Sequence, residues 1–590
     1  MACTSSASDW GSPPRRRATV RTGPGRRYPT HGLSLRKADK VVDHVFTKLV
    51  DTLGVQGMPT PEQIWADADL PTRRLAGLAL NPSVPESILL RLLSDAPLAA
   101  RMVLCRDRIL PDAVVDAVIE HPDTYTRSFF ARNLHVDPAQ RVRLVDDPEW
   151  FVRAHLAAGP RMAGLARPRP LPDEAAVHMI STYDDELLGG PFYQQISTGL
   201  RRSMPTHPIA KVRRWGVEAW ASLSTDVRAA LLTDPDGEVR KRAQLHARLE
   251  DPAWVESALP DRPCHARTDM LLHRPLTRAV VEGVLARPAG KEDKAMIAVN
   301  PTLPPDAVVL LAADSDPEVR CQIAQRADLG PAECRALVAD PEPDVRAQVA
   351  YRADLGPAER RTLMTDPHPD VRLAVSLHPA LSEEERDRID YQVPMDHRFG
   401  FHPAYEIVRD PGTVRRNALS NHPMLRREAA KDHLLPPDLV ARLAADDDLG
   451  VRVLLAQNHP DAPAPLLLRS FLEYTGPERS HLTTRPNFPT NGLAAFADHE
   501  DPEVRALAAR DPETEPTAVE RLTQDPEYAV RAAATRHPNL PPYRLAVLLD
   551  DEELAHDAAA NPALDLDTIR RLVEDGRPTG EAAGVAEPPV

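Results

Sequence analysis

Apolar residues recur along this chain in a fixed pattern that is clearest between residues 316 and 379. The segments DPEVRCQIA, EPDVRAQVA and HPDVRLAVS follow one another every 26 residues. We call the Arg of each V-R pair the marker; here the markers are Arg320, Arg346 and Arg372. Apolar residues one before and three after the marker lie four apart, so they share one face of a helix. The pattern predicts a short first helix in every unit.

A second helix follows in each unit. Breaks such as ADLGP and HLLPP end the first helix, and a Leu then lies 17 positions after the marker, as in Leu337 and Leu363. Pairs such as Asp316-Pro317 suit the start of a helix, because Asp accepts from free amides and Pro needs no partner in the first turn. Helices this short are marginal alone in water, so each unit must bury its apolar face against its neighbours.

The same spacing extends over most of the chain, with one long step after Arg153. The predicted markers are Arg74, Arg101, Arg127, Arg153, Leu187, Arg213, Arg240, Arg267, Lys294, Arg320, Arg346, Arg372, Arg398, Arg426, Arg452, Arg479, Arg505, Arg531 and His556. Self-similarity at a fixed period indicates a solenoid. We therefore expect an all-α solenoid of about nineteen two-helix repeats of roughly 26 residues.

The string D-P-x-V-R-x-x-x-A, followed by L-P-P-x-x-L-x-x-L, resembles the leucine-rich repeat variant family and, more broadly, HEAT-like α-solenoids. The resemblance covers nearly the whole chain, about residues 60–575. It implies a right-handed superhelix of helical layers without strands. Some members of the variant family carry a cysteine-rich iron–sulfur segment at the N-terminus; this chain has only Cys3 there, so no cluster is carried over.

The repeat and the composition together give the expected domains. Residues 1–35 are predicted to be a disordered basic arm, 36–59 an N-terminal capping helix, 60–575 the solenoid and 576–590 a disordered tail. Two stretches, 159–200 and 391–408, break the repeat pattern.

The charge is unevenly spread. The chain has a formal net charge of -15, although residues 1–40 alone carry +7. An acidic body argues against broad adhesion to nucleic acid or anionic lipid, except through the basic arm. The five cysteines include no CxxC pair, which suits a reducing cytoplasm. No apolar run approaches the roughly 18–20 residues that cross a bilayer, so no membrane partner is expected.

The markers could form a phosphate-binding stripe or a structural ladder that joins repeats. Each Arg follows a core Val, and acids such as Glu318 and Asp344 lie close by in the sequence. Arginine's planar fork suits bidentate pairing with a carboxylate. We therefore favour the structural reading, in which each Arg donates to an Asp, Glu or carbonyl of the adjoining repeat. The ladder residues are Arg127, Arg153, Arg213, Arg240, Arg320, Arg346, Arg372, Arg452, Arg505 and Arg531.

The sequence offers little catalytic chemistry. It contains no glycine-rich phosphate loop and no HExxH motif. Histidines such as His378 and His422 precede prolines and are interpreted as ends of first helices. Cys264, His265 and His273 lack a fourth metal ligand nearby. We expect no catalytic residue, no metal and no cofactor.

The irregular repeats concentrate the aromatic residues, which make up only 4% of the chain. Exposed aromatic side chains are common binding anchors, although these could instead fill a seam between two sub-arrays. The candidate binding residues are Phe192, Tyr193, Trp215, Trp220, Tyr391, Phe399, Phe401 and Tyr405.

Two functions compete. The leading hypothesis is a non-enzymatic cytoplasmic scaffold that holds a protein or peptide on a concave face lined by second helices. Its acidic body favours a basic partner by electrostatic steering. The alternative is a HEAT-like DNA glycosylase acting on alkylated bases, for which Trp215, Trp220, Glu218 and Asp226 are a partial match. The net charge and the chain length argue against this alternative.

Overall fold

The computed structural model describes residues 61–160, 168–183, 185–287, 291–393 and 410–576. The expected arm, the expected capping helix, residues 577–590 of the expected tail and most of the irregular stretch 391–408 lie outside these ranges. The chain divides into two compact units, Met1–Asp67 and Ala68–Val590. In the first unit only residues 61–67 are described, and they include helix α2, Pro61–Ala66. All that follows concerns the second unit.

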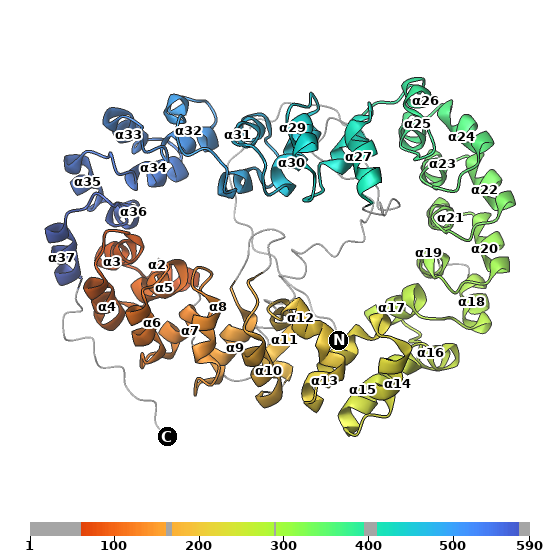
Figure 1. The fold of residues 1–590 in the computed structure, drawn as a ribbon, viewed down its shortest axis with the longest axis horizontal. Helices are drawn as coiled ribbons and strands as arrows, with labels where there is room; N and C mark the ends of the chain where they lie inside the picture. The colour runs from red at the N-terminus through yellow and green to blue at the C-terminus, as the bar shows by residue number, and fades with distance from the viewer. Residues whose placement is uncertain (1–60, 161–167, 184, 288–290, 394–409, 577–590) are drawn as a thin grey trace, which may run out of the picture. The chain divides into compact units, whose positions relative to one another are not determined.

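The second unit is a row of short helices without a strand in its described residues (Figure 1), so the predicted all-α solenoid is confirmed. First helices alternate with second helices. The first are α3 Leu70–Leu80, α5 Leu98–Asp107, α7 Thr124–Ala131, α9 Trp150–Ala158, α11 Asp185–Gln194, α13 Ala210–Gly216 with η3 Val217–Ser222, α15 Gly237–Arg248, α17 His265–His273, α19 Lys291–Val299, α21 Pro317–Ala324, α23 Pro343–Ala350, α25 Pro369–Ser376, α28 Pro423–Ala429, α30 Leu449–Asn458, η4 Arg479–Thr484, α32 Pro502–Ala508, α34 Tyr528–Thr535 and α36 Ala555–Ala559.

The second helices pack on one side of the first. They are α4 Glu86–Asp95, α6 Asp112–Ile119, α8 Pro138–Arg141 with η1 Val142–Leu144, α10 Asp173–Thr182, α12 Thr198–Ser203 with η2 Met204–Thr206, α14 Thr225–Leu232, α16 Pro252–Ala258, α18 Arg278–Leu285, α20 Pro305–Ala312, α22 Pro331–Val338, α24 Pro357–Met364, α26 Glu383–Asp387, α29 Pro437–Ala444, α31 Ala464–Glu473, η5 Ala494–Phe496, α33 Pro516–Leu522, α35 Pro542–Leu548 and α37 Leu566–Asp575. An additional helix, α27 Pro411–Leu419, precedes α28.

Every predicted marker except Arg398, which lies outside the described ranges, falls in a first helix. The apolar pattern around the markers forms the core. Val319, Val345 and Val371 precede their markers and are fully buried, and the second-helix residues Leu337 and Leu363 are equally buried. Burying an aliphatic side chain stabilises a fold by roughly 1.5–3 kcal/mol. Since one buried cluster extends from Val255 to Ile389, neighbouring repeats share a continuous core.

The ladder arginines join each repeat to the next. Arg320 donates through Nε and Nη2 to Asp340 at 2.7 and 2.9 Å, and Arg346 donates to Asp366 in the same way. Each arginine also donates through Nη1 to a carbonyl of its own repeat; Arg346 thereby contacts the backbone oxygen of Asp340 at 2.7 Å. One aspartate therefore accepts from the arginines of two successive repeats. Fork-shaped pairing of this kind combines strength with fixed geometry.

Arg127, Arg213 and Arg505 repeat this arrangement, and the remaining ladder residues vary it. Arg153 and Arg240 donate to the carbonyls of Asp147 and Asp234. Apart from those of Arg320 and Arg346, the ladder pairs are Arg127 with Asp147, Arg213 with Asp234, Arg372 with Asp390, Arg452 with Glu473, Arg505 with Asp525 and Arg531 with Glu553.

The acids that accept these arginines are not those expected from the sequence. Glu318 and Asp344 lie beside the markers along the chain, but the bidentate partners lie 20 or 21 residues after their arginine, as Asp340 and Asp234 do. Such an aspartate precedes the next first helix and also accepts an amide of its own turn, as Asp340 does from Glu342. The turn fixes this carboxylate, whereas an acid on the helix surface faces solvent. The partner is therefore set by packing between repeats rather than by sequence proximity.

A second set of hydrogen bonds runs along the ends of the first helices. Asn133 donates from Nδ2 to the carbonyls of Cys105 and Arg108 in the preceding repeat. Asn300 contacts Leu271 and Arg274 likewise. Buried carbonyls at helix ends need such donors. This pattern therefore identifies which repeat precedes which.

The same pattern joins the last repeat to the first. Asn81 donates to the carbonyls of Ala559 and Asn561 at 3.0 and 2.6 Å, and Arg74 donates to the carbonyl of Leu549 and to Asp550. Helix α3 packs against α36 and α37, which lie beside it in Figure 1. The row of repeats is therefore closed on itself, which the sequence did not predict.

Over much of the closed row the first helices lie on the inner side. In Figure 1, α19, α21, α23 and α25 lie nearer the centre than α18, α20, α22 and α24, and α34 lies inside α33 and α35. The expectation that second helices line the concave face is therefore wrong. The small residue four after the marker, such as Ala324 or Ala350, is fully buried and lets adjacent first helices pack closely on the shorter inner path.

Closure can be tested at Gly77, because a Cβ atom there would lie 2.1 Å from the carbonyl oxygen of His556. We expect Gly77→Ala to separate α3 from α36, raising the radius of gyration in X-ray scattering and lowering the melting temperature. Gly283→Ala is the matched control, since its Cβ would meet nothing within 4 Å; it should stabilise α18 by roughly 0.5–1 kcal/mol. If Gly77→Ala and Gly283→Ala have the same radius of gyration and the same melting temperature, closure is contradicted.

The ladder can be tested with Arg346→Ala. The substitution leaves the buried Asp366 without its arginine, so we expect a loss of about 3–5 kcal/mol in the free energy of unfolding measured by urea titration. Arg361→Ala removes an exposed arginine from α24 and should change stability by less than about 0.5 kcal/mol. A loss below about 1 kcal/mol for Arg346→Ala would show that the pair behaves as an exposed one.

Candidate functional site

The surface that varies between repeats is the exposed face of the first helix. Counted from the marker, this face comprises positions -2, +1, +2 and +5; in the α21 repeat these are Glu318, Cys321, Gln322 and Gln325, none of which is buried. Most other positions hold the core or the ladder, although some of these four are themselves buried in other repeats, as Gln348, Ala374 and Leu507 are. A binding site built on this scaffold is therefore expected on these positions.

A cavity of about 760 Å³ lies on this face across α11, α13, η3 and α15. It coincides with the irregular repeat at 159–200 and the repeats after it. Arg214, Trp215 and Glu218 occupy positions +1, +2 and +5 of one repeat, while Glu238, Lys241, Arg242 and Leu245 occupy -2, +1, +2 and +5 of the next. The remaining wall comes from Gly189, Gly190 and Tyr193.

The irregular repeat opens this cavity by breaking α11. Gly189 has φ 60° and ψ 179° and interrupts the helix, and Pro191 follows within it. A positive φ costs little for glycine but is unfavourable for residues with a Cβ atom. The missing side chains of Gly189 and Gly190 also leave space on the wall of the cavity.

Contacts with neighbouring side chains fix the orientation of the aromatic residues in the cavity. The ring of Trp215 packs edge-to-face on that of Phe192, with centroids 5.7 Å apart. Arg201 lies over the ring of Tyr193 at 5.1 Å. Rigid aromatic side chains lose little conformational entropy when they bind a partner. Tyr193 and Trp215 therefore present anchors that are already oriented.

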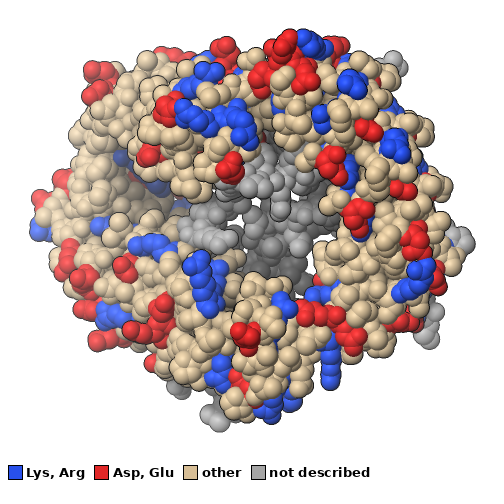
Figure 2. Space-filling view, turned by 45° about the vertical axis from the view of Figure 1, so that its right-hand side comes forward, with Lys and Arg blue, Asp and Glu red and all other residues tan. Residues whose placement is uncertain are grey.

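The charged side chains of the cavity are mostly paired. Arg242 donates from Nε to Glu218 at 2.6 Å, joining α15 to η3, and Lys241 contacts Glu238 at 2.6 Å. The lining carries three cations and two carboxylates, so it combines apolar walls with a nearly balanced charge. Figure 2 shows acidic and basic side chains scattered among tan residues over the face in view.

The predicted binding residues divide into four groups. Tyr193 and Trp215 line the cavity. Phe192 and Trp220 are buried and belong to the core behind it, because their rings complete the packing between α11, α13 and α15. Tyr391 is half-buried and stacks on His422, with centroids 4.3 Å apart. Phe399, Phe401 and Tyr405 lie outside the described residues.

The residues considered for glycosylase chemistry do not come together. Glu218 lines the cavity but is held by Arg242, Trp220 is buried, and Asp226 is exposed on α14 away from the lining. In the part of the chain that the structure describes, no three His, Cys, Asp or Glu side chains are grouped as metal ligands would be. The described cysteines, Cys105, Cys264, Cys321 and Cys334, are free thiols.

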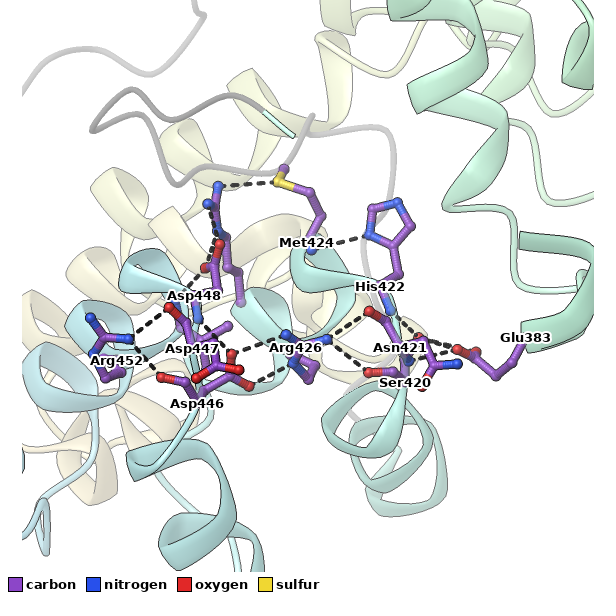
Figure 3. Close-up of polar contacts among 12 residues, drawn as sticks. Glu383, Ser420, Asn421, His422, Met424, Arg426, Asp446, Asp447, Asp448 and Arg452 are labelled. Atoms are coloured by element: carbon purple, nitrogen blue, oxygen red, sulfur yellow. Dashed lines mark hydrogen bonds and ion pairs between the residues drawn. The ribbon is translucent and has the colours of Figure 1, made fainter. Parts of the chain in front are cut away.

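A polar network joins α26, α28 and α30 (Figure 3). Glu383 accepts from the hydroxyl of Ser420 and from the amide of Asn421. Arg426 donates to the carbonyls of Ser420 and Asn421 and to Asp446, whose carbonyl accepts from Arg452. The arginine ladder therefore continues through this region.

His422 is the buried centre of this region and caps α28 rather than ending a first helix. Its Nδ1 accepts the amide of Met424 at 3.1 Å, so the neutral ring carries its proton on Nε2 and donates it to Ser376 Oγ at 2.8 Å. The Ser376 hydroxyl in turn donates to the carbonyl of Leu373. The serine is therefore not oriented as a nucleophile activated by this histidine. Burial and the charges of Arg386, Arg426 and Arg427 lower the pKa of His422 from 6.5 to about 3.

Comparisons with known proteins add little. No family model matches the chain, and no curated protein matches it. Among solved structures, the crystal structure of an engineered protein shares 15% identity and covers 89% of this chain and 98% of its own, with a TM-score of 0.10. At that TM-score the likeness carries no argument. What the geometry defines is a closed helical repeat protein. Within the described ranges, no helix is both long and apolar enough to span a membrane.

The depressed pKa of His422 gives a pH prediction. The neutral ring stabilises the fold fully above pH 6.5, and this contribution is lost as the pH falls from 6.5 toward 3, because the unfolded chain binds a proton that the folded chain excludes. Glutamine can replace the hydrogen bonds without titrating. We expect the melting temperature of the wild type to approach that of His422→Gln as the pH is lowered over this range. If the difference in melting temperature between the two proteins stays the same from pH 6.5 to pH 3, the prediction is contradicted.

Proposed function

We propose that this chain is a non-enzymatic cytoplasmic scaffold of the leucine-rich repeat variant or HEAT-like type, which binds a segment of a partner protein on its first helices. The observation that supports this proposal is the cavity at α11, α13, η3 and α15. It lies where the repeat pattern breaks, and insertions in solenoids often build the binding face. Its volume of about 760 Å³ lies within the range of pockets that hold a bound ligand.

The chemistry of the lining suggests the kind of segment. Tyr193 and Trp215 would contact an apolar or aromatic side chain of a peptide, and Leu245 extends the apolar wall. Lys241, Arg242 and their paired carboxylates would contact charges on either side of that anchor. The net charge of -15 favours the approach of a basic partner over a long range, while the mixed charges of the cavity would select among such partners at contact.

The test is selection of binding peptides from a displayed library on the wild-type chain, followed by affinity measurements on variants. We expect Tyr193→Ala combined with Trp215→Ala to weaken the selected peptides at least tenfold, since central aromatic anchors contribute roughly 2 kcal/mol or more each. Lys241→Glu, which leaves the core untouched, should weaken peptides that place an acidic residue here and strengthen those that place a basic one. Tyr543→Ala removes a tyrosine that is 63% exposed on α35 and should have no effect. Peptides that bind all variants equally would refute this site.

A further inference from the structure

A second cavity of about 440 Å³ lies on the first-helix face of α32, α34 and α36. It shares several repeat positions with the first cavity, but its composition is different. Ala509, which follows α32, and three alanines of α34 form part of its lining, together with Tyr528, Arg510 and Arg536. This site is far along the row from the first cavity, so an inference about it does not rest on the proposed function.

At the positions of the three alanines of α34, several other repeats carry larger or charged side chains. Position -2 is acidic in at least six other repeats, where it is Glu238, Glu292, Glu318, Asp344, Asp370 or Glu503, but it is Ala529 in α34. Positions +1 and +2 of this repeat are Ala532 and Ala533. The acid that would repel an anion is therefore missing in this repeat, and small side chains leave the space open.

Two arginines one repeat apart flank this space. Arg510 and Arg536 both occupy position +5. Arg510 is exposed, and its one hydrogen bond within the described residues is a 3.5 Å contact with the hydroxyl of Thr483. The side chain of Arg536 is 47% exposed. Both guanidinium groups therefore retain donors for a ligand.

The carboxylate of the cavity is already satisfied. Asp557 has a side chain that is 1% exposed; Arg536 donates to its Oδ1 at 2.6 Å, and the hydroxyl of Tyr528 donates to its Oδ2 at 3.1 Å. The pairing orients Arg536, as an acid beneath a guanidinium does in many anion sites. The amide of Asn539 donates to Nδ1 of His537, whose Nε2 contacts the carbonyl of Asp511. The lining is therefore positively charged overall.

We propose that this cavity binds an oxyanion, a carboxylate or a phosphate, carried on a small apolar group. The guanidinium groups of Arg510 and Arg536 bind the anion, and the attached group packs on the alanine floor and against Tyr528. Guanidinium groups match both anions through paired N–H donors. The volume exceeds what a bare inorganic anion would fill, which is why the ligand carries an organic group.

The experiment is saturation-transfer NMR of the full chain with three probes of similar size, phenyl phosphate, phenylacetate and the neutral phenylacetamide. We expect transfer to one or both anions and none to the amide. Comparing phenyl phosphate with phenylacetate distinguishes a phosphate ligand from a carboxylate ligand. No transfer to either anion, or equal transfer to the amide, would overturn the proposal.

Variants locate the binding on this cavity. Arg510→Gln and Arg536→Gln should each weaken the bound anion about tenfold, which is the usual effect of losing a charge-assisted hydrogen bond. Ala529→Glu restores the acid present in other repeats at an exposed position and should abolish binding without loss of helix content by circular dichroism. Arg521→Gln removes an exposed arginine from α33 and is the control. Binding that survives Ala529→Glu and both arginine variants would overturn the proposal, even if the anions bind elsewhere.

Discussion

The structure depends on aspartates at many of the junctions between repeats, each of which accepts two arginines. The carboxylate of such an aspartate binds the arginine of the preceding repeat, and its carbonyl binds the arginine of its own repeat, as Asp340 does with Arg320 and Arg346. The hydrogen bond from Arg505 likewise lowers the pKa of Asp525 below its usual value of 3.8. Both partners are largely removed from water, so neither can be lost without leaving the other uncompensated. This pairing fixes the spacing of the repeats, while the shared apolar core supplies most of the stability.

Closure of the row changes how this stability is distributed. An open solenoid exposes an apolar face at each end and needs capping repeats there. In this chain α3 lies against α36 and α37, and Asn81 makes the same carbonyl contacts to the last repeat that Asn133 makes to its own predecessor. The first and last helices of the row are therefore interior ones. Closure also gives the first helices a shared inner path, which explains why small residues recur four positions after the marker.

The side chains that can bind a ligand are those that neither pack in the core nor pair in the arginine ladder. In repeats such as those of α15 and α21, positions -2, +1, +2 and +5 are neither buried in the core nor used in the ladder, so their side chains can differ there. One run of repeats uses them for aromatic and mixed charged residues around Trp215, and another uses them for alanine and two arginines around Arg536. The scaffold is the same at both sites. The difference in ligand chemistry comes from a few substitutions on a constant helix geometry.

The sequence alone determined the helix pairs, their period and their core, because these follow from spacing within one repeat: Val345, Val349 and Leu363 lie where the pattern placed them. It could not determine contacts made across repeats. The acidic partners of the ladder arginines lie 18 to 22 residues away, and Phe192 and Trp220 are core residues rather than exposed anchors. Over much of the row the inner face belongs to the first helices. Nor could the sequence show that residues near 77 meet residues near 556. A small rotation from each repeat to the next accumulates over the whole row, and only the tertiary structure shows that its sum brings the two ends together.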